Sequence, residues 1–206
     1  MATKDVGTQP SHDDHLINKQ VTRAIYSQCK NGEWTTGPTC GQTAASFVSG
    51  DMYCTLFVPA RDCSVDQIGV NVTSSGFSSN LRLGIYELTI ASDGGMTTSL
   101  IVNGGTVSSG TTGVKTVSFT AVNLKYGKHY LVGVVWTGGG STPQIRFVAG
   151  PLGLGSISDP TTTVALDASF GEAYWLTGVG TGALPSNPSV NVSAGLGPLI
   201  AIHCSA

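Results

Sequence analysis

Charged residues are scarce in this sequence, because Asp, Glu, Lys and Arg together make up only 11% of its 206 residues. An ordinary soluble domain contains roughly 25%. The formal net charge is −2, and no run of Lys and Arg occurs that would form a basic patch for nucleic acid. Ser, Thr, Asn and Gly must therefore cover much of the surface. Such a surface suits a protein that packs against other subunits, and we expect no nucleic-acid partner.

Long apolar runs are also missing. No segment approaches the roughly 20 apolar residues that cross a bilayer. The first residues, Met1 to Asp5, lead into polar sequence and not into the apolar stretch of a secretion signal. Hydrophobic residues nevertheless make up 40% of the chain, which is enough to build a core. We expect a chain that is made in a cytoplasm and does not insert into a membrane.

Metal-binding and nucleophile motifs are absent as well. The sequence has no Gly-x-Ser-x-Gly elbow, and its glycine-rich stretches precede no helical pattern that would cradle a phosphate. The five cysteines lack the close pairs of a zinc site, and the four histidines do not complete a ligand set around them. We therefore expect no catalytic residue, no metal and no cofactor.

Carboxylates that might form a glycosidase pair do occur, at Asp66, Glu87, Asp159, Asp167 and Glu172. Such a pair must face across a cleft at a separation of about 5–10 Å. No pattern in the sequence brings two of these residues together. For Asp66, we expect an ion pair with the neighbouring Arg61 in a turn.

Residues 1–50 differ in texture from the rest and predict an N-terminal arm, extended or partly helical, that attaches the chain to its partners. The string His12-Asp13-Asp14-His15 contains side chains that bind divalent ions. An exposed arm with helix-capping aspartates explains it equally well. The segment 16–28 matches both a helical spacing and a strand alternation, and both interpretations stay open.

Cys29 and Cys40 are the candidate disulfide, because they bracket a segment rich in turn residues. A disulfide that closes so short a loop would stabilise the fold by about 2–3 kcal/mol. Synthesis in a cytoplasm favours reduced thiols, whereas later exposure to oxidising surroundings favours the disulfide.

From residue 51 onward, short runs of apolar and β-branched residues are separated by Gly, Ser, Thr, Pro and Asn. These runs predict strands at 52–58, 65–73, 81–88, 100–102, 114–119, 129–136, 144–148, 173–179 and 199–203. Long loops are expected at 150–163 and 180–198. The pattern predicts an all-β fold for residues 51–206, a jelly-roll-like antiparallel β-sandwich of about 8–9 strands.

Several large aromatic residues are candidates for binding. Trp136 ends an apolar run and is expected in the core, whereas Trp34 lies in a loop of Gly and Thr and is expected to be exposed. Trp34, Tyr174 and Trp175 are therefore candidates either for stacking on a sugar ring or for anchoring a subunit interface.

Five segments of strand and turn residues stand out in the second part of the chain. They are Phe-Val-Pro-Ala-Arg at 57–61, Val-Asp-Gln-Ile-Gly-Val at 65–70, Leu-Arg-Leu-Gly-Ile-Tyr at 81–86, Gly-Val-Lys-Thr-Val at 113–117, and Trp-Leu-Thr through Gly-Ala-Leu-Pro at 175–185. Their order resembles a β-sandwich module of tail-fibre and other structural proteins of tailed bacteriophages. The resemblance runs from about Met52 to the end of the chain, and Cys54 and Cys63 depart from it.

The resemblance implies a non-enzymatic structural protein of a virion, made in the bacterial host cytoplasm. It would be a fibre, spike, collar or capsid-decoration subunit, anchored by its arm, whose sandwich projects or packs in a symmetric oligomer, with a trimer favoured. Other virion proteins are then the expected partners. An alternative is an attachment module that binds a host receptor or a surface glycan, and a further hypothesis is a polysaccharide hydrolase.

Overall fold

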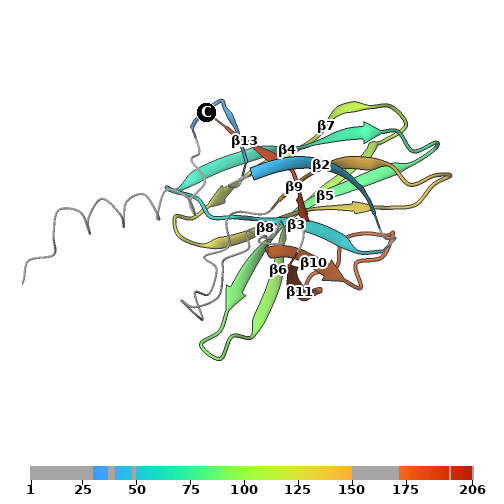
Figure 1. Ribbon diagram of the computed structural model, residues 1–206. Coiled ribbons are helices and arrows are strands. Elements are labelled where there is room, and N and C mark those ends of the chain that lie inside the picture. The colour runs from blue at the N-terminus through green and yellow to red at the C-terminus, as the bar shows by residue number, and fades with distance from the viewer. Residues whose placement is uncertain (1–29, 37–39, 48–49, 150–171, 195, 206) are drawn as a thin grey trace, which may run out of the picture.

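The computed structural model describes residues 30–36, 40–47, 50–149, 172–194 and 196–205. These residues form thirteen strands and no helix, and the strands are arranged in two antiparallel sheets (Figure 1). The predicted all-β antiparallel sandwich is therefore confirmed.

The larger sheet has seven strands and is organised around β4 (Cys63–Ser74). One side of β4 pairs with β7 (Gly113–Leu124), and the other pairs first with β13 (Ile200–Cys204) and then with β9 (Gln144–Ala149). Three short strands complete the sheet: β1 (Trp34–Thr36) pairs with β13, while β2 (Cys40–Ser46) and β12 (Leu196–Pro198) pair with β9.

The smaller sheet has six strands in the order β11, β10, β3, β8, β5, β6. Their bounds are β3 (Met52–Phe57), β5 (Asn80–Ile90), β6 (Met96–Ser108), β8 (His129–Trp136), β10 (Glu172–Thr177) and β11 (Ser189–Ala194). The nearly continuous apolar run 129–136 was expected at the centre of a sheet, and β8 indeed lies between β3 and β5.

The main core lies between the two sheets and follows from period-two alternation along the strands. On β4, Ile68, Val70 and Val72 are buried toward the smaller sheet. On the smaller sheet, Leu83 of β5 and Val134 of β8 are register partners of each other, and both belong to the same buried cluster as the β4 residues. The residues between these buried positions point to the outer faces of the sandwich.

A second apolar cluster covers the outer face of the smaller sheet. It contains Tyr86 of β5 and Leu131 of β8, together with Val179 and Leu184 from the segment 178–188 that follows β10. Backbone carbonyls of this segment accept hydrogen bonds from the sheet, since Tyr86 Oη donates to Pro185 O at 3.0 Å. The chain thus seals one outer face of the sandwich with its own residues.

All nine predicted strands correspond to observed strands, although several are longer than expected. The expected loop at 180–198 is wrong in its second half, where β11 and β12 form. The reason is that the alternating sequence of residues 189–193 pairs with β10, while Pro188 and Pro198 fall at strand ends, where proline is tolerated. The expected loop at 150–163 lies outside the described residues.

Two strands lie before the expected domain boundary at residue 51. β1 and β2 belong to the larger sheet, and Phe47 after β2 is buried against Tyr53 and Phe147. The described part of the segment expected to be an arm thus contributes strands to the sandwich. Whether residues 51–206 fold without it stays a prediction.

Candidate functional site

The outer face of the larger sheet carries an acid–imidazole pair. His203 Nδ1 and Asp66 Oδ1 are 2.7 Å apart, and both side chains are partly buried. The pairing of β4 with β13 skips Asp66, because Cys204 pairs with Val65 and His203 with Gln67. A β-bulge of this kind redirects a side chain, and here it brings Asp66 to His203. The ion pair expected between Asp66 and Arg61 is therefore wrong.

Trp34 lies directly across from His203 in the pairing of β1 with β13. The two rings are in contact, with centroids 5.4 Å apart and planes inclined by 56°. Backbone bonds before β1 hold this edge in place, because Gly32 N donates to Cys204 O at 2.7 Å and Cys204 N donates to Glu33 O at 3.0 Å. Trp34 is nevertheless 44% exposed, so the expectation that it is exposed is confirmed, whereas its expected place in a loop is wrong because it begins strand β1.

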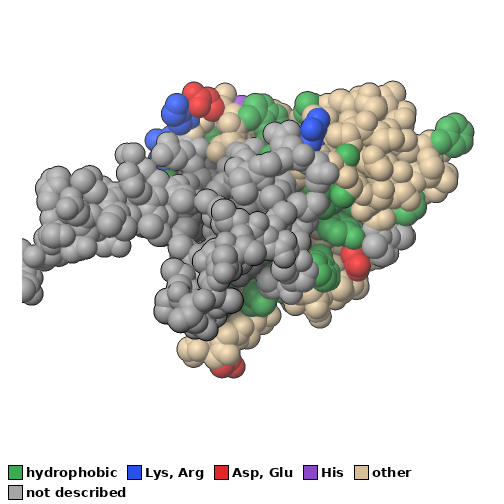
Figure 2. Space-filling model, viewed as in Figure 1, with side chains coloured by type: hydrophobic (Ala, Val, Ile, Leu, Met, Phe, Trp, Pro, Cys, Tyr) green, Lys and Arg blue, Asp and Glu red, His purple; other side chains and the backbone are tan. Residues whose placement is uncertain are grey.

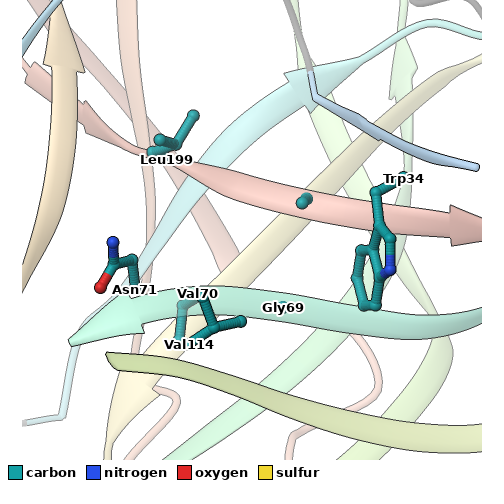
Figure 3. Close-up of a pocket in the computed structure, with 7 residues that line it drawn as sticks. Trp34, Gly69, Val70, Asn71, Val114 and Leu199 are labelled. Atoms are coloured by element: carbon teal, nitrogen blue, oxygen red, sulfur yellow. The ribbon is translucent and has the colours of Figure 1, made fainter. Parts of the chain in front are cut away.

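The indole of Trp34 reaches across β13 toward Gly69 of β4 (Figure 3). A Cβ atom at position 69 would lie 3.1 Å from Trp34 Cζ3 and 3.3 Å from Thr116 Cγ2. Both separations are tighter than ordinary van der Waals contact, so a side chain here would push against the indole. Glycine inside a strand often marks such a close approach. Gly69 is therefore the residue in the sequence that could have indicated this site.

A pocket of about 230 Å³ opens beside the indole (Figure 3). It extends over the outer faces of β1, β13, β4 and β7, and nearly all of its lining is apolar. The lining residues are Trp34, Gly69, Val70, Asn71, Val114, Leu199 and Ala201. Four different strands build the pocket, and residues 34 and 201 are far apart in the sequence, so the chain pattern alone could not assemble it.

The other candidate aromatics lie elsewhere in the molecule. Tyr174 is buried in the second apolar cluster, while Trp175 is half-buried and pairs with Tyr53 of β3. Both belong to the smaller sheet, so the structure does not bring them together with Trp34. Trp136 packs against the main core, as expected.

The candidate carboxylates do not converge in the described part of the chain. Asp66 belongs to the larger sheet, whereas Glu87 lies on the smaller sheet and forms an ion pair with Lys128. Asp159 and Asp167 lie outside the described residues, and the side chain of Glu172 in β10 is not described. Within the described ranges, no three His, Cys, Asp or Glu side chains gather in a way that would hold a metal ion.

The candidate disulfide and the N-terminal candidates stay predictions. Cys29 and the string at residues 12–15 lie outside the described residues, and Cys40 falls within β2 with its side chain undescribed. Cys54, Cys63 and Cys204 are buried. Burial raises the pKa of the Cys54 thiol far above its usual range, so this group stays protonated.

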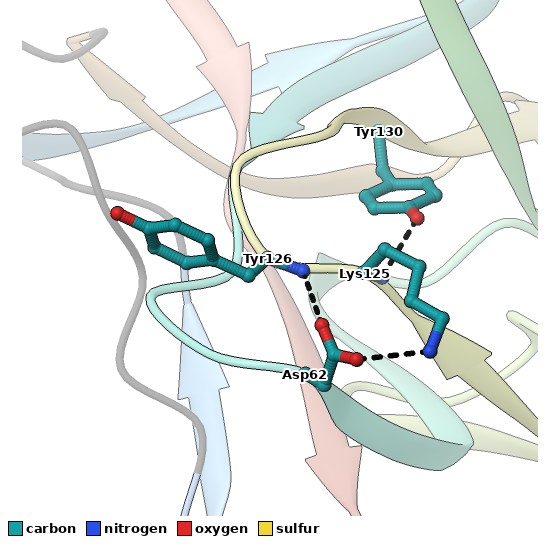
Figure 4. A network of polar contacts seen from close by, with 4 residues as sticks. All are labelled: Asp62, Lys125, Tyr126 and Tyr130. Carbon is teal, nitrogen blue, oxygen red and sulfur yellow. Dashed lines mark hydrogen bonds and ion pairs between the residues drawn. The ribbon is translucent and has the colours of Figure 1, made fainter.

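A polar network fastens the turn before β4 to the turn before β8 (Figure 4). Asp62 accepts hydrogen bonds from the backbone N–H of Tyr126 at 2.8 Å and from Lys125 Nζ at 2.9 Å. The backbone N–H of Lys125 donates to Tyr130 Oη at 2.9 Å. Two hydrogen bonds hold the pKa of Asp62 below its ordinary value. The larger cause is the bond from the backbone N–H of Tyr126, and the second is the bond from the Lys125 ammonium. The side chain of Tyr126 points away from this network.

No protein-family model matches the sequence, and no curated protein matches it either. The described residues include no helix that is long and apolar enough to span a membrane.

Proposed function

We propose that this protein is a non-enzymatic structural protein of a bacteriophage virion. It serves as a subunit of a fibre, spike, collar or capsid decoration. Copies of the chain form a symmetric homo-oligomer, and this oligomer packs against other virion proteins. The single observation that carries the proposal is a β-sandwich from a chain with only 11% charged residues that exposes large apolar side chains.

The surface is the first support for this proposal. Among the side chains coloured in Figure 2, those of Lys, Arg, Asp and Glu are few. Large hydrophobic side chains stand in solvent on the described surface, among them Phe77 at 78% exposure and Val114 at 71%. Covering such groups with a neighbouring subunit lowers the free energy, and low surface charge weakens repulsion between copies.

Phe77 shows how such a side chain is prepared for contact. Its backbone N–H donates to Ser141 Oγ at 2.8 Å, and its carbonyl accepts from the N–H of Gly140 and of Ser141. These bonds tie the loop after β4 to the loop before β9. An exposed aromatic residue on a fixed loop loses little entropy when a partner covers it.

The resemblance to phage structural modules is the second support. Its segments coincide with the end of β3, with β4, β5 and β7, and with β10 and the segment that seals the smaller sheet. They therefore include both the framework strands and the sealing segment, with no chemical motif among them.

The test is the composition of purified particles. We expect mass spectrometry to find this chain in the particle at a copy number that is a multiple of the appendage symmetry. Electron microscopy of particles that lack the gene should then show one missing or altered appendage. Particles complete in every appendage, or particles that never contain the chain, would contradict the proposal.

An attachment function is the second candidate, and the pocket beside Trp34 is the observation that favours it. Structural and attachment functions are compatible, because one subunit can pack through some surfaces and bind a host molecule through another.

A further inference from the structure

We propose that the pocket beside Trp34 binds one neutral pyranose ring of a glycan. The proposal names the ligand class and site for the attachment candidate, and it relies on the proposed virion function only for the source of the glycan, a host surface.

The shape of the pocket matches the two-sided character of a sugar ring. A pyranose has an apolar C–H face and a polar rim of hydroxyl groups, and an indole is a flat wall on which such a face can stack. Trp34 forms that wall, while Ala201 and Leu199 of the β12–β13 segment and Val114 of β7 supply the remaining apolar surface.

Asn71 supplies the polar contact at the edge of this surface. It is partly exposed and lines the pocket (Figure 3). In the described part of the chain no hydrogen-bond partner occupies its amide group. A carboxamide offers two donors and one acceptor, and this combination can hold two neighbouring hydroxyl groups of one ring.

Size and charge restrict the ligand. The volume of about 230 Å³ is smaller than the roughly 300–1,000 Å³ of pockets for drug-sized molecules, so it fits a single ring and not an extended chain of residues. None of the lining side chains is charged. A neutral hexose therefore suits the pocket better than a phosphorylated or carboxylated sugar.

The aromatic wall is fixed before the ligand arrives. The indole of Trp34 contacts the imidazole ring of His203, and the imidazole is in turn positioned by its polar contact with Asp66. Gly69 leaves room for the indole to lie against β4. A wall that is already ordered costs little conformational entropy on binding, which matters for a small ligand with few contacts.

The experiment is saturation-transfer NMR on the full chain, with the methyl glycosides of glucose, galactose, mannose and N-acetylglucosamine as probes. We expect at least one of them to receive saturation and to bind with a dissociation constant of about 1 mM, as befits one ring in a small pocket. Trp34→Ala removes the wall, and Gly69→Val displaces the indole while Trp34 is retained. Each should weaken binding at least about tenfold.

Two controls make the result specific. Phe77→Ser removes an exposed aromatic residue at another place on the surface and should leave binding unchanged. Gly69→Ala, which requires a shift of only a few tenths of an ångström, should fall between the wild type and Gly69→Val. Circular dichroism melting of each variant shows whether it is folded, so a loss of binding by a folded variant is a property of the pocket.

Several outcomes would overturn the inference. They are a failure of all four glycosides to bind at about 10 mM, equal binding by the wild type and Trp34→Ala, or self-association that Trp34→Ala abolishes without any sugar binding. The last would show that a second copy occupies the pocket. Particle composition separates the two proposals: a chain present in virions that binds no sugar contradicts only this inference, and a sugar-binding chain absent from virions contradicts only the proposed function.

Discussion

The two outer faces of the sandwich differ in whether the chain covers them. The outer face of the smaller sheet is covered by the segment 178–188, whose Leu184 is buried and whose carbonyls accept hydrogen bonds from β5 and β6. The outer face of the larger sheet has an open pocket, beside a tryptophan that remains 44% exposed.

The difference leaves one outer face closed by the chain itself and the other accessible, which is the basis of the binding proposal. On the covered face, polar side chains donate hydrogen bonds to backbone carbonyls of the same chain. Thr98 Oγ1, for example, donates to Pro188 O at 2.8 Å. On the open face, the amide of Asn71 has no such partner among the described residues. A polar group that is bonded within the chain stabilises the fold, whereas an accessible one without a partner in the chain can exchange its water for a hydroxyl group of a ligand.

The largest expected effect comes from removing the strands that frame the open face. Deleting residues 1–50 eliminates β1, β2 and the buried ring of Phe47, and we expect a loss of at least about 3 kcal/mol in the free energy of unfolding, the scale of losing one buried phenylalanine. Deleting residues 1–29 keeps both strands and is the matched control. Urea titration of the two truncated proteins measures the difference.

This comparison also tests the domain boundary expected at residue 51. A protein of residues 51–206 that unfolds as cooperatively and at the same urea concentration as the longer one would show that β1 and β2 contribute nothing to the sandwich. It would support an independent arm.

The next effect compares one aliphatic residue on each outer face. Leu184→Ala removes buried contacts on the covered face and should lower the free energy of unfolding by about 2–4 kcal/mol. Val114→Ala, at a residue that is 71% exposed on the open face, should change it by no more than about 0.5 kcal/mol. Equal losses in thermal or urea unfolding would contradict the contrast between the faces.

A smaller effect is expected from one hydrogen bond that holds the covering segment. Burial raises the pKa of the Tyr86 phenol, which therefore stays protonated and donates to Pro185 O. Tyr86→Phe should cost about 1 kcal/mol, because it leaves the carbonyl without this donor. Thr98→Val, which removes the bond to Pro188 O, should behave alike. Urea midpoints unchanged in both variants would mean that the segment is held by apolar contacts alone.

The smallest effect belongs to Asp62, whose side chain is exposed. Its pKa in the folded protein lies below the ordinary value of 3.8 because of the bonds from Tyr126 and Lys125. The stabilisation from this carboxylate is therefore present above about pH 4 and is lost as pH falls through the lowered pKa. Asp62→Asn should remove this part of the acid dependence, as followed by urea midpoints from about pH 5 to pH 2. A pH profile identical to the wild type would exclude the linkage.

The strands were predictable where burial imposes a pattern. The run 129–136 is apolar on both sides because β8 is covered on both faces, and the bounds predicted for it are those of the structure. β1 and β2 were missed because they are short or built from small polar residues, and they exist through pairing with β13 and β9. No local sequence pattern predicts strands of that kind, because they depend on their pairing partners.

The site was predictable only at Trp34. Its exposure follows from its place in a polar, turn-rich segment. The pairing of His203 with Asp66 joins residues 137 positions apart and depends on a bulge in β4, which the alternation of Ile68 and Val70 does not indicate. Gly69 was visible as a glycine inside a strand, but its meaning depends on an indole that arrives from another strand.

The most direct test of the open face is a two-dimensional ¹H–¹⁵N NMR titration that follows the indole N–H signals of Trp34, Trp136 and Trp175. The three residues report, in turn, on the pocket, the main core and the smaller sheet. With a methyl pyranoside that binds, we predict a saturable shift of the Trp34 signal while the other two stay in place. A shift of the Trp175 signal with Trp34 unmoved would contradict the account, because binding would then occur at the smaller sheet.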